Sequence, residues 1–263
     1  MIVVGMRSIL FIGLMASLFS CSSPKKDTLY QYSTIDALLA AVYEGEMTCC
    51  DLMKKGDFGI GTFDCLDGEM ILLDGALYQV KSDGKVYRPS LDTKTPFAAV
   101  CNFESDDRLT IDHDLNFESF EQLLDKRFPN HNLFYAIKLE GSFETVKTRS
   151  VPRQNKPFPE LAEVAKHQPE FDLGPCRGSI VGFRCPAYVK GVNVPGYHLH
   201  FLNEDRSRGG HVLSFKLLEA EIEIDTLHGF SVDLPKESEA FSKSDLKQDR
   251  SHELEQVEKL RQD

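Results

Sequence analysis

The sequence predicts an α+β protein that is rich in β-strands, with antiparallel or mixed sheets and a few peripheral helices. Short apolar runs between residues 58 and 103 are separated by Asp-Gly pairs, the strongest short signal for a hairpin turn. Longer runs over residues 133–148 and 211–224 alternate apolar and polar side chains, as half-buried strands do. Helical spacing of apolar residues is confined to short stretches, so strands are expected to form the framework.

The N-terminus has the features of an export signal. Arg7 precedes an apolar run over residues 9–16 that is too short to span a bilayer as a permanent helix. The string Leu-Phe-Ser that follows, ending at Cys21, resembles a bacterial lipobox. We therefore expect a lipoprotein-type signal peptide over residues 1–20 and a polar tether over residues 21–28. The mature chain would be lipid-anchored at Cys21 in the bacterial cell envelope, on the periplasmic or cell-surface side; an ordinary signal peptide is the alternative.

The charge of the chain is strongly acidic. The formal net charge is −11, from 30 basic and 41 acidic residues. A general nucleic-acid binder needs a basic stripe for the phosphate backbone, so this balance argues against one. It does not exclude an anionic small molecule, provided that a local arginine or a metal ion offsets the charge.

Seven cysteines are present, and no CxxC spacing indicates a structural zinc. An exported protein could pair some of them. Cys176 and Cys185 flank an expected turn, so either a disulfide or two buried free thiols is compatible with the sequence.

The N-terminal region of the chain is predicted to be one helix followed by a meander of strands. Thr34 is a good N-cap for a short helix over residues 35–43, which Gly45 would end. Gly-containing turns then separate the strands. The expected strands cover residues 58–63, 69–73, 76–80, 85–87 and 97–103.

The C-terminal region alternates helices and longer strands. Asn116 is expected to cap a helix over residues 117–128, and Pro129 stops it. Further elements are expected over residues 133–148 (strand), 160–167 (helix) and 178–184 (strand). The charged segment 244–263 is predicted to be a marginal helix or tail that must dock on the rest of the protein to be ordered.

A histidine-rich hairpin is the main candidate for chemistry. Alternation along a strand puts His198 and His200 on one face, with Leu199 and Phe201 on the other. A polar loop over residues 203–210 then leads to a second strand that begins with His211. Three imidazoles with an open fourth position suit a catalytic zinc or similar divalent ion. Surface or hydrogen-bonded histidines are the alternative.

Strict alternation in the second strand makes a further prediction. It places three apolar residues on the face of His211, namely Leu213, Phe215 and Leu217.

Three charged residues could complete such a site. Glu69 is the one acid that enters an apolar strand after a turn, although a surface carboxylate at a strand end fits too. Arg149 ends a long strand and could anchor a carboxylate through a bidentate contact, or it could be a surface arginine. Glu204 lies in the polar loop, where a solvated side chain is favoured over a metal ligand.

Several strings in the same order resemble the α-acetolactate decarboxylase family. They are residues 61–63, 66–69, 73–75, 147–152, 194–201 and 209–211. The likeness runs from about residue 29 to residue 258. It implies a fold of two β-rich halves, about 29–150 and a metal-binding half of about 151–263, in a protein that is usually a homodimer. It also implies zinc-dependent decarboxylation of (S)-2-acetolactate, a small 2-hydroxy-3-oxo acid, to (R)-acetoin and CO2 through a metal-stabilised enediolate.

The resemblance assigns roles to positions of this sequence. His198, His200 and His211 match the zinc ligands of the family. Glu69 and Arg149 match its active-site glutamate and arginine. Thr62 falls where the family has a threonine facing the pocket, and Glu258 is the best match for a C-terminal glutamate near the metal, with Glu253 and Glu255 as rivals.

Two other functions fit some features of the sequence. Gly191, the His198-x-His200 pair and Glu204 come near the first metal motif of the cupins, in which Glu204 would be a ligand. The match misses by one residue before His198, and His211 follows too soon for a second cupin motif. The other alternative is a lipid-anchored binding or envelope protein without catalytic activity.

Overall fold

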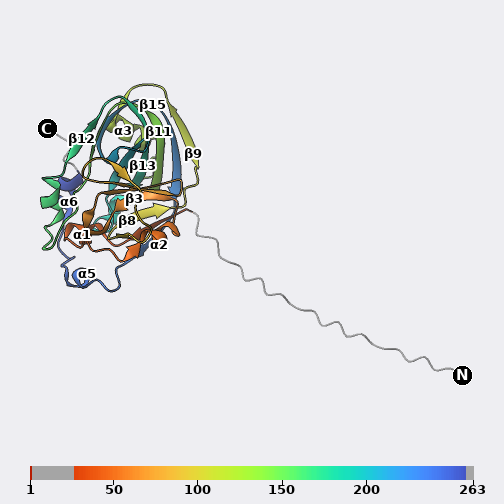
Figure 1. The fold of residues 1–263 in the computed structure, drawn as a ribbon. Coiled ribbons are helices and arrows are strands. Elements are labelled where there is room, and N and C mark those ends of the chain that lie inside the picture. The colour runs from red at the N-terminus through yellow and green to blue at the C-terminus, as the bar shows by residue number, and fades with distance from the viewer. Residues whose placement is uncertain (2–26, 259–263) are drawn as a thin grey trace.

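The structure, a computed structural model, describes Met1 and residues 27–258. Over these residues a pair of large β-sheets pack face to face, and short helices lie around their edges (Figure 1). The predicted β-rich α+β class is confirmed. The predicted signal peptide, the lipid site at Cys21 and most of the tether lie outside the described residues. None of the helices within the described ranges is long and apolar enough to cross a membrane.

The first sheet has seven strands in the order β16-β1-β8-β3-β4-β5-β6. Its neighbours pair antiparallel except β1 and β16, which are parallel, so the sheet is mixed. Asp74 and Gly75 join β4 to β5 with φ of 51° and 72°, the backbone of a two-residue hairpin turn. The strands are β1 (Thr28–Tyr32), β3 (Phe58–Thr62), β4 (Glu69–Leu73), β5 (Ala76–Val80), β6 (Val86–Tyr87), β8 (Ala98–Cys101) and β16 (Gly229–Asp233).

The second sheet is built around one long strand, β15 (Gly209–Leu227). Pairings of β11 with β13, β13 with β14, β14 with β15 and β15 with β11 close these four strands into a ring. The other strands of this sheet are β9 (Asp107–Ile111), β10 (Leu115–Asn116), β11 (Phe134–Arg149), β12 (Glu170–Leu173), β13 (Cys176–Cys185) and β14 (Gly196–Asn203). A separate pair is formed by β2 (Met47–Thr48) and β7 (Lys94–Thr95).

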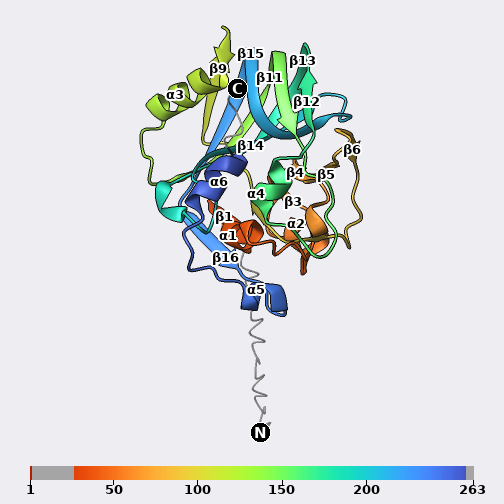
Figure 2. The same cartoon turned by 90° about the vertical axis from the view of Figure 1, so that its left-hand side faces the viewer.

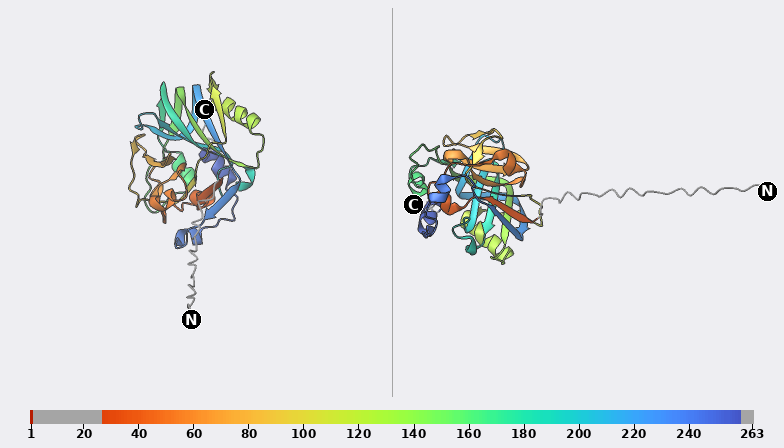
Figure 3. Two further views of the ribbon diagram at one scale, coloured as in Figure 1. Left: turned by 90° about the vertical axis from the view of Figure 1, so that its right-hand side faces the viewer. Right: turned by 90° about the horizontal axis from the view of Figure 1, so that it is seen from below.

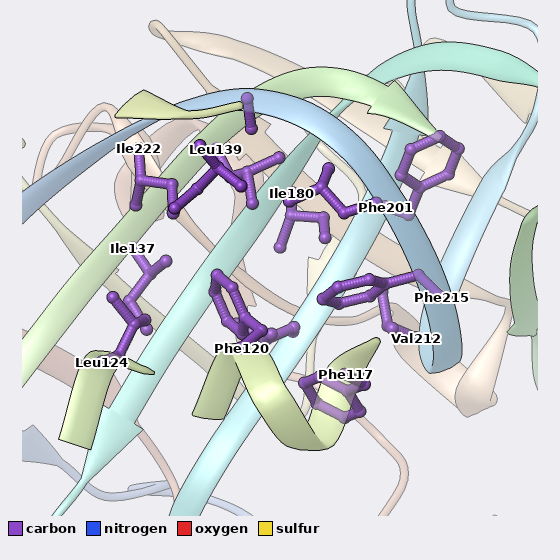
Figure 4. Close-up of a cluster of buried hydrophobic side chains, with 14 of the residues drawn as sticks. Phe117, Phe120, Leu124, Ile137, Leu139, Ile180, Phe201, Val212, Phe215 and Ile222 are labelled. Atoms are coloured by element: carbon purple, nitrogen blue, oxygen red, sulfur yellow. The ribbon is translucent and has the colours of Figure 1, made fainter. Parts of the chain in front are cut away.

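Apolar side chains bury both faces of the second sheet. One face packs against the first sheet, where Ile60 and Ile71 meet Val181 and Phe183. The other face packs under α3 (Phe117–Arg127), as Figure 4 shows for Phe120 and its neighbours. The right-hand view of Figure 3 shows the order of the layers: first sheet, second sheet, then α3.

The helices follow the predicted caps more closely than the predicted lengths. Asn116 caps α3 by accepting a hydrogen bond from Ser119 N at 2.8 Å, as expected. Thr34 caps α1 (Ile35–Leu39), but that helix ends before Ala41, whose φ is 62°, and not at Gly45. The remaining helices are α2 (Cys49–Met53), α4 (Leu161–Ala165), α5 (Glu239–Lys243) and α6 (Ser251–Glu258), with 3-10 turns at Asp64–Leu66 and Ala187–Val189.

The structure contradicts a disulfide between Cys176 and Cys185. Cys176 and Cys185 occupy the first and last positions of β13, so an extended strand separates them, and both are free thiols. The disulfide hypothesis is therefore wrong for this pair.

The chain passes from the first sheet to the second between β8 and β9, and it returns to the first sheet for β16. The division into halves near residue 150 stays a prediction.

Candidate metal centre

The three histidines of the hairpin converge at one end of the space between the two sheets. His200 and His211 are directly paired across β14 and β15, and His198 precedes His200 by two residues on the same face. One ring nitrogen from each histidine lies within 4.8 Å of the others. His200 and His211 are almost fully buried, and His198 is partly exposed. This spacing and donor set match a site for a divalent ion with an open position.

A β-bulge turns His211 toward the other two histidines. Thr148 pairs with Val212, but Lys147 pairs with Ser214, which leaves Leu213 as an extra residue. Alternation is broken there, so Val212 shares the core under α3 with Phe215. The prediction that Leu213, Phe215 and Leu217 all lie on the face of His211 is wrong. His211 instead projects from the opposite face, toward the first sheet.

The backbone of the first sheet fixes the orientation of His200. Its Nδ1 lies 2.9 Å from the carbonyl oxygen of Met70, so Nδ1 carries the proton and donates it. Nε2 then keeps its lone pair, and this buried atom has no hydrogen-bond partner among the described residues. Burial and the neighbouring His198 lower the pKa of His200 to about 3, which keeps the ring neutral. A neutral ring held by a carbonyl is the usual form of a metal-ligating histidine.

Glu69 reaches the histidines from the first sheet. It is paired with Thr62 across β3 and β4, and its Oε2 lies 3.7 Å from Nε2 of His200. The backbone N–H of Val151 donates to Oε1 at 3.3 Å. Burial raises the pKa of Glu69 to about 7, and the opposing attraction of Arg149 is the smaller effect. The carboxyl group can therefore hold a proton near neutral pH, as a general acid must.

Arg149 and Glu258 lie on the other side of the histidine group from Glu69. Arg149 is the last residue of β11, is paired with His211, and is 3% exposed. Its guanidinium donates to the carbonyl of Val257 and lies 4.0 Å from Oε1 of Glu258. Oε2 of Glu258 lies 3.5 Å from Nε2 of His211. A cation and a carboxylate thus face the histidines together.

Helix α6 holds Glu258 in this place. Leu254 and Val257 of α6 pack in an apolar cluster with residues of α1 and α4, and Figure 2 shows these three helices on one face of the molecule. The rival acids point elsewhere: Glu253 accepts from Arg250 at 2.6 Å, and Glu255 is exposed. Of the three candidate glutamates, the structure therefore brings Glu258 to the histidines.

These side chains enclose a cavity of about 50 Å³. Thr62 lines it, and its hydroxyl donates to the carbonyl of Gly68 at 2.8 Å. Apolar walls come from Ile35, Leu38, Leu66, Phe97, Val151, Leu161 and Val257. Its lining combines these apolar walls with a few polar and charged side chains, as sites for small molecules do.

Glu204 lies away from the cavity, whereas Gln168 lines it. Glu204 is not at the cavity: its side chain is 72% exposed and lies 3.6 Å from Arg177, as a solvated loop residue would. Gln168 does line the cavity, yet nothing in the sequence singled it out. Its only local signal is the helix-ending Pro169 that follows it.

Gly182 of β13 lets β14, the strand that carries His198 and His200, pack closely beside it. We therefore expect Gly182→Ala to disturb the site. A Cβ there would lie 2.1 Å from the carbonyl oxygen of His198, a backbone atom that can move only with its strand. The substitution should lower the free energy of unfolding by about 1–3 kcal/mol and weaken metal binding. Chemical denaturation and a zinc titration measure the two effects.

Gly174→Ala is the matched control, because a Cβ at Gly174 meets nothing within 4 Å. Unchanged stability and metal affinity in Gly182→Ala would show that β14 tolerates the displacement.

The comparisons with known proteins agree with one another. A family model described as Alpha-acetolactate decarboxylase matches residues 29–248. The protein of that name from Methanosarcina mazei is 48% identical over 238 residues, 90% of this chain and 82% of that protein. The one from Methylococcus capsulatus is 44% identical, with 88% of each covered. The crystal structure of alpha-acetolactate decarboxylase from Bacillus subtilis strain 168 matches with a TM-score of 0.86 at 39% identity, covering 88% of this chain and 99% of that one.

Proposed function

The chain belongs to the alpha-acetolactate decarboxylase family, and from this premise we propose that it converts (S)-2-acetolactate to (R)-acetoin and CO2 with zinc. The predicted family is confirmed, and the chain is an acetolactate decarboxylase, a carboxy-lyase. The choice of zinc and the two configurations are the proposal. The observation that carries it is the group of three converging histidines, with a buried carboxyl group on one side and an arginine on the other.

Zinc is supported by the donor set. His198, His200 and His211 would hold the ion through ring nitrogens, and imidazole is a common ligand of zinc. Once bound, such an ion supplies a Lewis acid that polarises oxygen atoms of the substrate.

Arg149 and Glu69 have complementary tasks in this proposal. The guanidinium of Arg149 attracts the substrate carboxylate into the cavity and orients it. Negative charge develops on the substrate as CO2 leaves, and a proton must then reach carbon. Glu69 is the better donor because burial favours the protonated form of its carboxyl group, whereas a guanidinium does not release its proton. Glu69 is fixed on one wall by Val151, so delivery to one face would give a single enantiomer of acetoin.

The direct test is acetoin formation from racemic acetolactate by the chain without residues 1–20. We expect (R)-acetoin on chiral chromatography, loss of activity after treatment with a chelator, and recovery when zinc is added back. Full activity in a sample shown to be metal-free would contradict zinc dependence. Acetoin of mixed configuration from the enzyme would contradict proton delivery from one side.

We also propose that the mature protein is a homodimer anchored through a lipid on Cys21. The lipobox-like string supports the anchor, and the family resemblance supports the dimer. Retention of Cys21→Ser protein in the membrane fraction would contradict the anchor. A monomeric mass by light scattering would contradict the dimer.

A further inference from the structure

Gln168 lines the metal cavity. It lies in the short link between α4 and β12, immediately before Pro169. The carbonyl of Pro169 accepts a hydrogen bond from the N–H of Ser150 at 3.3 Å. This contact ties the link to the residue that follows Arg149, so Gln168 and Arg149 reach the same cavity from adjacent segments.

The amide of Gln168 is buried without a hydrogen bond. Both its Oε1 and its Nε2 are inaccessible to solvent, and neither has a partner among the described residues. A buried amide that makes no hydrogen bond is unfavourable for folding, so such groups are rare in folded proteins. Gln168 can form its hydrogen bonds with a molecule that occupies the cavity.

Other polar side chains of the cavity already have protein partners. Thr62 donates to the carbonyl of Gly68, and Arg149 donates to the carbonyl of Val257. Glu69 accepts from the N–H of Val151. A carboxylate offers about four lone-pair sites, and a bidentate contact with one arginine fills two of them. An additional neutral donor beside Arg149 would complete its binding.

We propose that Gln168 is a substrate-binding residue whose amide N–H donates to the carboxylate of acetolactate beside Arg149. The inference rests on the proposed function, because it takes acetolactate as the molecule in the cavity. It has a kinetic consequence. The carboxylate is lost as CO2, so this hydrogen bond stabilises bound substrate more than it stabilises the later states of the reaction.

The test compares two ligands that differ in the carboxylate. One is 2,3-dihydroxy-2-methylbutanoate, which is the substrate with its ketone reduced so that it does not react. The other is acetoin, which has no carboxylate. Calorimetric titration of the zinc-loaded full chain gives their affinities for wild type and for Gln168→Leu, which has similar size but no hydrogen-bonding group.

We expect Gln168→Leu to bind the carboxylate analogue about tenfold more weakly, while its affinity for acetoin stays within about twofold. KM for acetolactate should rise by a similar factor, with a smaller change in kcat. Gln168→Glu, the same shape with a negative charge, should weaken the analogue further by repulsion. His167→Gln is the matched control, since that side chain is 78% exposed and adjacent.

The outcomes separate the inference from the proposed function. Equal weakening of both ligands would mean that Gln168 only shapes the cavity, and wild-type affinities in Gln168→Leu would likewise overturn its role. Wild-type protein that binds neither ligand would instead overturn the proposed function, and this inference with it. If Gln168→Leu does not fold, judged by thermal unfolding and zinc content, Gln168→Met, which has nearly the same length and also lacks a hydrogen-bonding amide, decides the question.

Discussion

Glu69→Gln is expected to lower kcat about a thousandfold while zinc binding is retained. The substitution keeps the shape and the hydrogen bond from Val151 but removes the acidic proton of the side chain. The three histidines are untouched, so metal content should stay at one ion per chain. Acetoin formation and elemental analysis on the same preparation measure both quantities. Undiminished turnover would remove Glu69 from the chemistry, whereas loss of the metal would make it a ligand.

The same substitution should stabilise the metal-free protein at alkaline pH. Burial raises the pKa of Glu69 from 4.5 to about 7 in the folded state, so folding favours the protonated form. Below about pH 4 the group is protonated in both states and has no effect on stability. Between about pH 4.5 and pH 7 the unfolded chain releases this proton while the folded chain keeps it, so the wild type loses stability as the pH rises, and the loss is complete above about pH 7. Glutamine avoids this loss, so at pH 8 the variant should gain about 2–3 kcal/mol.

Denaturant titrations of metal-free protein at pH 4 and pH 8 would measure this difference. Glu204→Gln is the control, because that carboxylate is 72% exposed and the exchange should leave stability unchanged at both pH values. A gain for Glu69→Gln of the same size at pH 4 would show that better packing is its cause, and not the removal of a charge.

Local patterns in the sequence were enough to predict much of the framework. The turn at Asp74-Gly75 and the caps Thr34 and Asn116 depend on neighbouring residues only, and all three are found as expected. The placement of His198 and His200 on the same face depends only on the two-residue period of a strand. These features could be read without knowing which strands pair.

Local patterns could not show features that depend on pairing or packing between distant segments, although the family resemblance assigned Glu69 and Glu258 to the site. The bulge at Leu213 exists because β15 follows the register of β11, and no local pattern marks it. The meeting of Glu69 with His200 depends on how the two sheets pack. Glu258 lies beyond the matched segment 29–248, and its position depends on how α6 docks. Gln168 has no sequence signal because a buried amide becomes unusual only once its surroundings are known.

A comparison of zinc affinity between His211→Ala and Glu204→Ala tests whether the metal site is cupin-like, and we expect a large loss in His211→Ala only. In a cupin the glutamate four residues after His200 would be a ligand, but here Glu204 is exposed beside Arg177, whereas His211 completes the histidine group. We expect His211→Ala to weaken zinc binding at least about a hundredfold and Glu204→Ala to leave it unchanged. Competition with a chromophoric chelator measures the affinities, and the zinc-dependent rise in Tm checks them independently. The reverse pattern would move the metal toward the loop and would leave the carboxyl group of Glu69 without a role beside it.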